Sequence, residues 1–141
     1  SESHSHMFKI SDKEGIRKFM FKWIRDGGRV VIWSRDLSWV DDDSKSLLLQ
    51  KARANELVVC VPNSIPLTDE LRQSGADVRT YGHAKHVPAS RFTIVHYEKG
   101  GARVAVGRPK GKIHLIEEFA ANDHPAFHMA DDLVRIIQQA E

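Results

Sequence analysis

Histidine is the residue type with the widest chemical scope in this sequence. An imidazole can attack phosphorus, transfer a proton near neutral pH or bind a metal ion. After the first seven residues the histidines are His83, His86, His96, His114, His124 and His128. Only His124 and His128 have the four-residue spacing of a helical zinc site, and Pro125 stands where H-E-x-x-H has its glutamate. We therefore predict no metal site and no cofactor, with these histidines on the surface or capping helices.

A cluster of basic residues lies in the segment RVAVGRPKGK. Its cations are Arg103, Arg108, Lys110 and Lys112. The neighbouring glycines leave backbone amides open, and amides together with cations can bind phosphate. The G-x-x-x-x-G-K-S/T spacing of a Walker loop is absent. The segment indicates either a solvated basic loop or a phosphate or nucleic-acid contact, to which Arg91 and His96 would contribute.

Acidic residues surround Trp39. Asp36 precedes this tryptophan, and residues 41–43 form an aspartate triplet after it. Such carboxylates could hold magnesium at the end of a strand, or they could solvate the loop and favour the start of the next helix. Trp39 itself predicts either an interface anchor or a core residue.

The composition is that of an ordinary globular protein. Of the 141 residues, 41% are hydrophobic and 28% are charged, and the formal net charge is +2. So small a charge does not by itself indicate nucleic-acid binding. No apolar run reaches the ~18 residues of a membrane span, and the single Cys60 excludes an internal disulfide, so we expect a cytoplasmic location and no membrane contact. We expect Cys60 to be a buried core residue within LVVCV.

The first seven residues, SESHSHM, resemble an expression scar, and residues 8–141 are of a length that predicts a single domain. The first part of that domain alternates helices with apolar runs. Helices are predicted over 12–25, from Ser44 to Asn55, and over 68–73, and strands over 29–33, 57–61 and 77–81. This order indicates right-handed crossovers between parallel strands.

The second part of the domain has a different pattern. RFTIVHY at 91–97 alternates, EKGG at 98–101 predicts a hairpin turn, and 102–107 returns as a partner strand. A further strand is expected at 112–117, and a closing helix over 124–139 with Phe127, Leu133, Ile136 and Ile137 on its apolar side. The predicted fold class is α/β, with a mixed, mainly parallel central sheet flanked by helices.

The string RFTIVHYEKGGARVAVGR resembles the motif region of phospholipase-D-type domains. That family carries a strand with His-x-Lys-x-x-x-x-Asp, a tight turn, and a strand ending in Gly-Ser. The preceding strands RVVIW and LVVCV and the passage LRQSGADVRTY also fit, so the resemblance covers nearly the whole chain from about Asp12. It implies that the chain is one phospholipase-D-like half domain.

The catalytic residues of that family do not carry over onto this sequence. If Arg91 takes the lysine position, Ala89 takes that of the nucleophilic histidine and His96 that of the aspartate, while Arg108 follows Gly107 in place of serine. Alanine cannot attack phosphorus. His83-Ala84-Lys85 spells His-x-Lys by itself, but Ser90 stands at its aspartate position and Pro88 would interrupt the strand. The alternative reading of this triplet is a polar turn.

The resemblance implies a noncatalytic binding or dimerisation module of a larger regulatory, defence or nucleic-acid-processing protein. Active members join two halves around one cleft, so a homodimer is expected, with a phosphate-containing ligand or nucleic acid on the basic segment. The alternative function is a phosphodiesterase or nuclease that uses His83 and Lys85 across a homodimer, or His96 and His114, in catalysis. A third alternative is a structural oligomerisation domain without a ligand.

Overall fold

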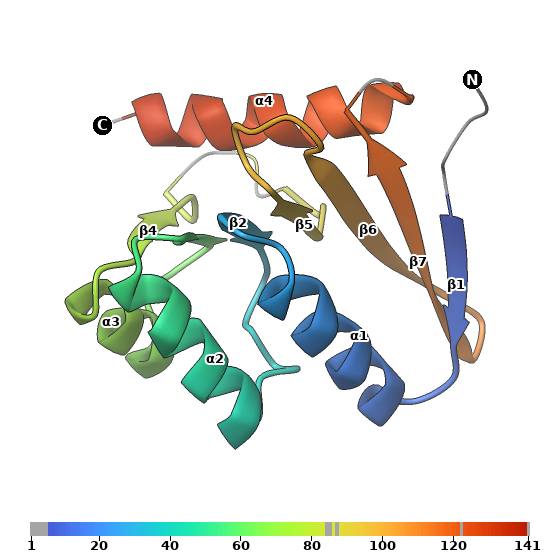
Figure 1. Ribbon diagram of the computed structural model, residues 1–141, viewed down its shortest axis with the longest axis horizontal. Coiled ribbons are helices and arrows are strands. Elements are labelled where there is room, and N and C mark those ends of the chain that lie inside the picture. Colours follow the sequence, from blue (N-terminus) through green and yellow to red (C-terminus); the bar gives the residue numbers. More distant parts are fainter. Residues whose placement is uncertain (1–5, 84–85, 87, 122, 141) are drawn as a thin grey trace.

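The computed structural model describes residues 6–83, 86, 88–121 and 123–140. In this part of the chain, seven strands form one sheet in the order β1-β7-β6-β5-β2-β3-β4. The strands are β1 (His6–Ile10), β2 (Val30–Trp33), β3 (Leu57–Val61), β4 (Asp77–Thr80), β5 (Phe92–Val95), β6 (Arg103–Lys110) and β7 (Ile113–Ala120). The helices are α1 (Lys13–Arg25), α2 (Asp42–Arg53), α3 (Pro66–Gln73) and α4 (Pro125–Gln139). Helices α1, α2 and α3 cover one face of the sheet and α4 covers the other (Figure 1).

The α/β class with flanking helices is confirmed, but the expectation of a mainly parallel sheet is wrong. Only β2/β3 and β3/β4 pair in parallel, and the other four pairings of the described strands are antiparallel. The parallel pairs are those whose strands are joined by a helix. A seven-residue connection joins β5 to β6 and a two-residue turn joins β6 to β7. Such hairpins produce only antiparallel neighbours. Strand β5 then pairs antiparallel with β2 at the centre of the sheet.

The helix starts follow from side-chain caps. The carboxylate of Asp12 accepts a hydrogen bond from the backbone N–H of Gly15 at 2.8 Å and begins α1, as expected from the sequence. The N-cap of α2 is Asp41 rather than the predicted Ser44, because the carboxylate of Asp41 accepts from the N–H of Ser44 at 2.9 Å, and the helix begins at Asp42. Asn55 follows the end of α2 with φ +59°, which is the left-handed conformation expected of asparagine there.

The core has two layers, one on each face of the sheet. On the α4 face, the ring of Trp33 stacks on Tyr81 and Phe92, with centroid distances of 4.8 and 5.4 Å. On the other face, Ile24, Leu48 and Leu71 from the three helices are fully buried against the strands. Because β2 and β3 are covered on both faces, all of their residues are buried, which explains their continuous apolar runs.

Strand β5 differs in detail from its prediction. All four of its residues are buried, so the alternating exposure expected for 91–97 is wrong, and the strand ends before His96, which has φ +52°. Strand β1 was not predicted, and it includes His6 and Met7 from the segment assigned to an expression scar. On α4, Phe127 is buried as expected, whereas Ile136 is 62% exposed and does not belong to the apolar side. Within the described residues no helix is long and apolar enough to cross a membrane.

Candidate functional site

A pocket lies on the α1 face of the sheet, between α1, the loop at 34–40 and strands β5 to β7. We call it the α1 pocket, and it has a cavity volume of about 160 Å³. Its apolar wall includes Ile16 and Met20 of α1, Trp39 of the loop and Ile116 of β7. Its polar groups are Ser34, Asp36, Ser38, Arg91, Thr93 and His114. An apolar cavity with a few converging polar groups is the usual form of a ligand site.

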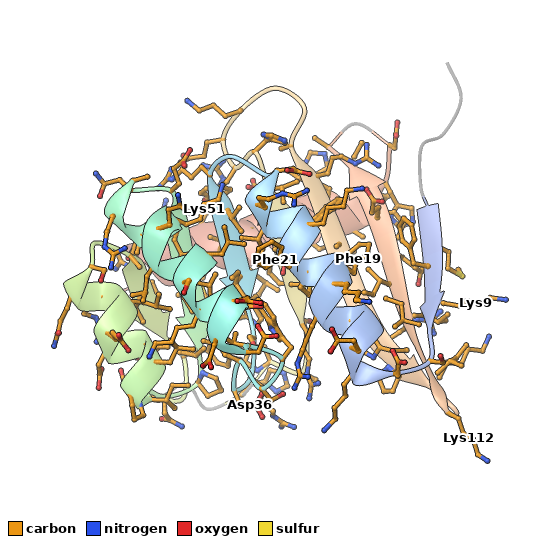
Figure 2. The ribbon with its side chains drawn as sticks, turned by 60° about the horizontal axis from the view of Figure 1, so that its bottom comes forward. Lys9, Phe19, Phe21, Asp36, Lys51 and Lys112 are labelled. Carbon is orange, nitrogen blue, oxygen red and sulfur yellow. The ribbon has the colours of Figure 1, made fainter. Side chains whose placement is uncertain are left out.

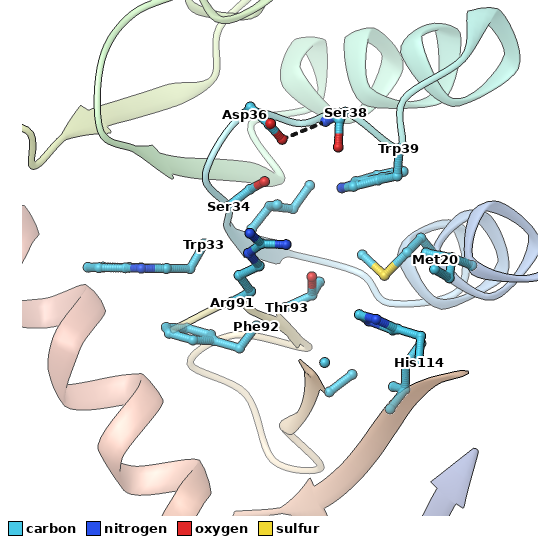
Figure 3. Close-up of a pocket in the computed structure, with 15 residues that line it drawn as sticks. Met20, Trp33, Ser34, Asp36, Ser38, Trp39, Arg91, Phe92, Thr93 and His114 are labelled. Carbon is cyan, nitrogen blue, oxygen red and sulfur yellow. Dashed lines mark hydrogen bonds between the residues drawn. The ribbon is translucent and has the colours of Figure 1, made fainter. Parts of the chain in front are cut away.

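Arg91 is an exposed residue that lines the α1 pocket. Figure 3 shows its guanidinium between the loop residues Ser34 and Trp39 on one side and His114 on the other. The residue precedes β5, and its carbonyl oxygen accepts a hydrogen bond from the N–H of Gly107 at 3.4 Å. The segments matched above to the family's lysine and Gly-Ser positions are therefore adjacent in space. The position matched to the histidine holds the exposed Ala89.

His114 lies on β7 and faces the same pocket. Its strand neighbour in β6 is Pro109, and its Nε2 is 2.8 Å from the point where a Cβ on Gly107 would stand. A side chain at position 107 would thus displace the imidazole, and glycine leaves room for it. Burial, and in second place the positive charge of Arg91, lower the pKa of His114 below its ordinary value. This imidazole is therefore mainly neutral at pH 7.

The loop at 34–40 forms a wall of the pocket that is fixed by its own hydrogen bonds. The hydroxyl of Ser34 accepts from the N–H of Leu37 at 3.1 Å, and the carboxylate of Asp36 accepts from the N–H of Ser38 at 3.0 Å. Leu37 has φ +57° and is nevertheless buried, so its conformation is held by the surrounding packing. Trp39 is half-buried against the core, which favours the core alternative, and its role at an interface stays a prediction.

The aspartates near Trp39 serve as caps. Asp36 closes the loop turn and Asp41 begins α2, as described above, while Asp42 and Asp43 lie in the first turn of that helix. In the described part of the chain, no three side chains among histidine, cysteine, aspartate and glutamate gather into a possible metal site. The arrangement therefore supports the solvating and helix-starting role rather than magnesium binding.

His96 and Arg103 line a second hollow, at the other end of α1. This hollow has a volume of about 370 Å³, with Phe8, Phe19 and Trp23 along one side. Arg103 forms an ion pair with Glu118 on its floor, with Nε 3.2 Å from Oε1. His96 follows the residue paired with Arg103, whereas His114 is paired with Pro109. At about 3.3 Å per residue along β6, the two histidines are roughly 20 Å apart and cannot act on one phosphorus atom.

The remaining cations of the basic segment diverge. Arg108 points to the α4 face and pairs with Glu117, with Nε 3.3 Å from Oε1. Lys110 and Lys112 are exposed at the tip of the β6–β7 hairpin, where Lys112 projects outward (Figure 2). The six residues predicted to contact a ligand thus do not form one surface, and only Arg91 lies in the α1 pocket.

The other reactive side chains lie elsewhere. His83 is exposed after β4, and Lys85 lies outside the described residues, so the His-x-Lys triplet has no described geometry. His124 caps α4 by accepting at Nδ1 from the N–H of Ala126 at 3.0 Å, and His128 is exposed on that helix. Cys60 is fully buried, and burial raises the pKa of its thiol to about 12. Its assignment to the core is confirmed.

Comparison with known proteins supports the fold. No protein-family model matches the chain, and no curated protein matches it in sequence. The structure is similar to the crystal structure of polyphosphate kinase from Porphyromonas gingivalis, with a TM-score of 0.68 and 10% sequence identity. The match covers 97% of this chain and 26% of that chain, so this chain spans about a quarter of its length. Because that kinase has a phospholipase-D-type fold, the match supports a phospholipase-D-like fold here.

Proposed function

We propose that this chain is a noncatalytic phospholipase-D-like module that binds a phosphate-containing ligand in the α1 pocket. The observation that carries the proposal is the guanidinium of Arg91 on the lining of this pocket, at the position matched to the lysine of the resembling family. A planar guanidinium donates several N–H groups in a geometry that suits phosphate oxygens. The similarity to a polyphosphate kinase agrees with a phosphate-containing ligand.

The electrostatics of the pocket favour an anion. Two side chains that can carry a positive charge, Arg91 and His114, line it, and Arg91 is close enough to lower the pKa of His114. The carboxylate of Asp36 also lines the pocket, but one of its oxygens already accepts from the N–H of Ser38. A phosphate group would meet hydroxyl donors as well, from Thr93 and Ser38.

The noncatalytic part of the proposal rests on the missing nucleophile. Ala89 replaces the histidine that the resembling family uses for attack, and His96 is too far from His114 to complete a pair within one chain. We also propose, from the family's two-half architecture, that the module works in a homodimer or beside a second domain of a larger regulatory or nucleic-acid-processing protein.

Binding of inorganic phosphate and pyrophosphate, measured by calorimetry and by backbone amide shifts, tests the proposal. The Arg91→Gln variant should bind at least about tenfold more weakly, because a hydrogen bond to a charged group contributes roughly 1.5–3 kcal/mol. Arg53→Gln is a matched control, since Arg53 is exposed at the end of α2 and does not line the pocket. Equal affinities in wild type and Arg91→Gln would refute the site.

A turnover assay tests the enzyme alternative. The observation that favours an enzyme is the imidazole of His114 beside Arg91, which is a possible arrangement for attack on phosphorus. Bis(p-nitrophenyl) phosphate should not be hydrolysed by wild type above the level of a His114→Gln variant. Hydrolysis that wild type catalyses and that this variant loses would show an active phosphodiesterase.

A further inference from the structure

His114 has an unusual position in the sheet. It lies on an inner strand, flanked by Ile10 of β1 and Pro109 of β6, with its ring against the Cα of Gly107. Ile10, Pro109 and Gly107 have no polar side-chain atom that could form a hydrogen bond with the imidazole. The ring therefore faces the α1 pocket as the polar side chain of the wall that β6 and β7 form.

The charged groups that face His114 come from two elements. Arg91 approaches from the start of β5, and Asp36 lies across the pocket in the loop after β2. The pocket side chains of α1, Ile16 and Met20, do not titrate. Arg17 of that helix donates instead to the carbonyl oxygen of Trp39 at 3.3 Å, on the rim. In the absence of a ligand, Arg91 thus opposes protonation of His114.

A bound dianion reverses this balance. Its two negative charges would offset the charge of Arg91 and attract a proton onto the imidazole, which then donates to the ligand. The proton comes from solvent, and no bond of the ligand is formed or broken. Two positive charges then face two negative ones. A phosphodiester group carries only one negative charge and gains less from the protonated ring.

The size of the pocket points to one end of a ligand. Its volume of about 160 Å³ is smaller than the roughly 300 Å³ at which sites for whole small molecules begin. A terminal phosphate and its attached atoms fit this space, while the remainder of the ligand stays outside. An internal phosphate would have to bring chain in on both sides.

We propose that the α1 pocket selects a terminal, doubly charged phosphate group, and that His114 takes up a proton when this group binds. This inference rests on the proposed phosphate site and assigns to His114 both the selectivity and the dependence on pH. The module would then recognise the ends of phosphate-containing ligands, with an affinity that rises as the pH falls toward the second pKa of the phosphate, about 6.

Sulfate is the first probe, because it remains a dianion while the protein titrates between about pH 5 and pH 8. Between the pKa of His114 in the free protein and its raised pKa in the sulfate complex, the wild-type affinity for sulfate should rise nearly tenfold for each unit by which the pH falls. Calorimetry in buffers of different ionisation enthalpy should show uptake of close to one proton. The His114→Gln variant should lose the pH dependence and keep a weaker binding through Arg91. His128→Gln, an exposed histidine of α4, is the matched control and should behave as wild type.

Methyl phosphate and dimethyl phosphate are the second pair of probes. Wild type should bind the monoester at least tenfold more tightly at about pH 7, and sulfate should raise the pKa of His114 as followed by imidazole NMR. Sulfate binding that does not change with pH, or a pH dependence that survives in His114→Gln, would overturn the inference and leave the phosphate site intact. Equal binding of the two esters would do the same. If no anion binds at any pH, the proposed function itself fails.

Discussion

Replacing Gly107 with alanine tests the packing on which the α1 pocket depends. The added methyl carbon would stand 2.8 Å from Nε2 of His114, whereas ordinary contacts begin at 3.4 Å, so the imidazole must move by roughly 0.6 Å or more. Because this ring is the end of a partly exposed side chain, it can rotate away toward solvent. The variant should therefore change the position of His114 with little change in the strands.

The expected effect on stability is small. Overpacking costs about 1–3 kcal/mol, and a ring that can rotate places Gly107→Ala at the low end. Alanine also removes backbone freedom from the unfolded chain, which offsets roughly 0.5–1 kcal/mol. The free energy of unfolding should thus stay within about 1 kcal/mol of wild type. The pKa of His114 should move up toward its ordinary value of about 6.5, because the displaced ring is hydrated and farther from Arg91.

Imidazole NMR titration measures that pKa, and urea unfolding measures the stability. Gly100→Ala is the matched control, since no heavy atom lies within 4 Å of its added methyl group. This control should leave the pKa of His114 as in wild type. The reasoning is refuted if the pKa of His114 is equally low in wild type and in Gly107→Ala, or if it is not below about 6.5 in wild type.

Three further predictions follow from burial and close packing. The pKa of His114 is lower in the folded than in the unfolded state, so the unfolded state binds more protons and the free energy of unfolding should fall as the pH drops below about 6.5. The urea midpoint of wild type should show this decrease, and that of His114→Gln should show much less of it. Cys60, with its pKa raised to about 12, should not react with Ellman's reagent in the native state and should react in urea, and rapid native labelling would contradict its burial. Gly27→Ala should lower the free energy of unfolding in urea by about 2–3 kcal/mol, because its methyl would lie 2.6 Å from Cγ1 of Val95 and 2.8 Å from a backbone oxygen. A loss of stability as small as that of Gly100→Ala would contradict the packing described.

Local sequence signals predicted the helices and the central strands well. Asp12 with its helical apolar pattern placed the start of α1, and the run at 57–61 placed a fully buried strand. These features depend on neighbours in the sequence, on caps and on periodicity, so a single chain contains the information. Resemblance to phospholipase-D-type domains predicted the fold, which the structural match supports.

The direction of the sheet and the composition of the pocket depend on contacts that sequence spacing does not encode. Nothing local to 91–97 states that β5 would lie antiparallel against β2, which buries all four of its residues. The sequence alone assigns Arg91 to a ligand contact and His114 to a catalytic alternative. The two residues lie at one pocket because of the β6–β7 hairpin, in which Gly107 pairs with Ile116. The alternation along β7 was the one available signal, since it places His114 on the same face as Ile116.

The length of α1 has a consequence for how the chain assembles. Strands β1 and β2 are joined by this helix but lie four strand spacings apart in the sheet, which is about 19 Å, and thirteen helical residues extend over about 20 Å. The helix thus spans a gap that β5, β6 and β7 fill later in the sequence. During synthesis on a ribosome, the facing edges of β1 and β2 would therefore stay unpaired until β5, β6 and β7 have been made and occupy the space between them.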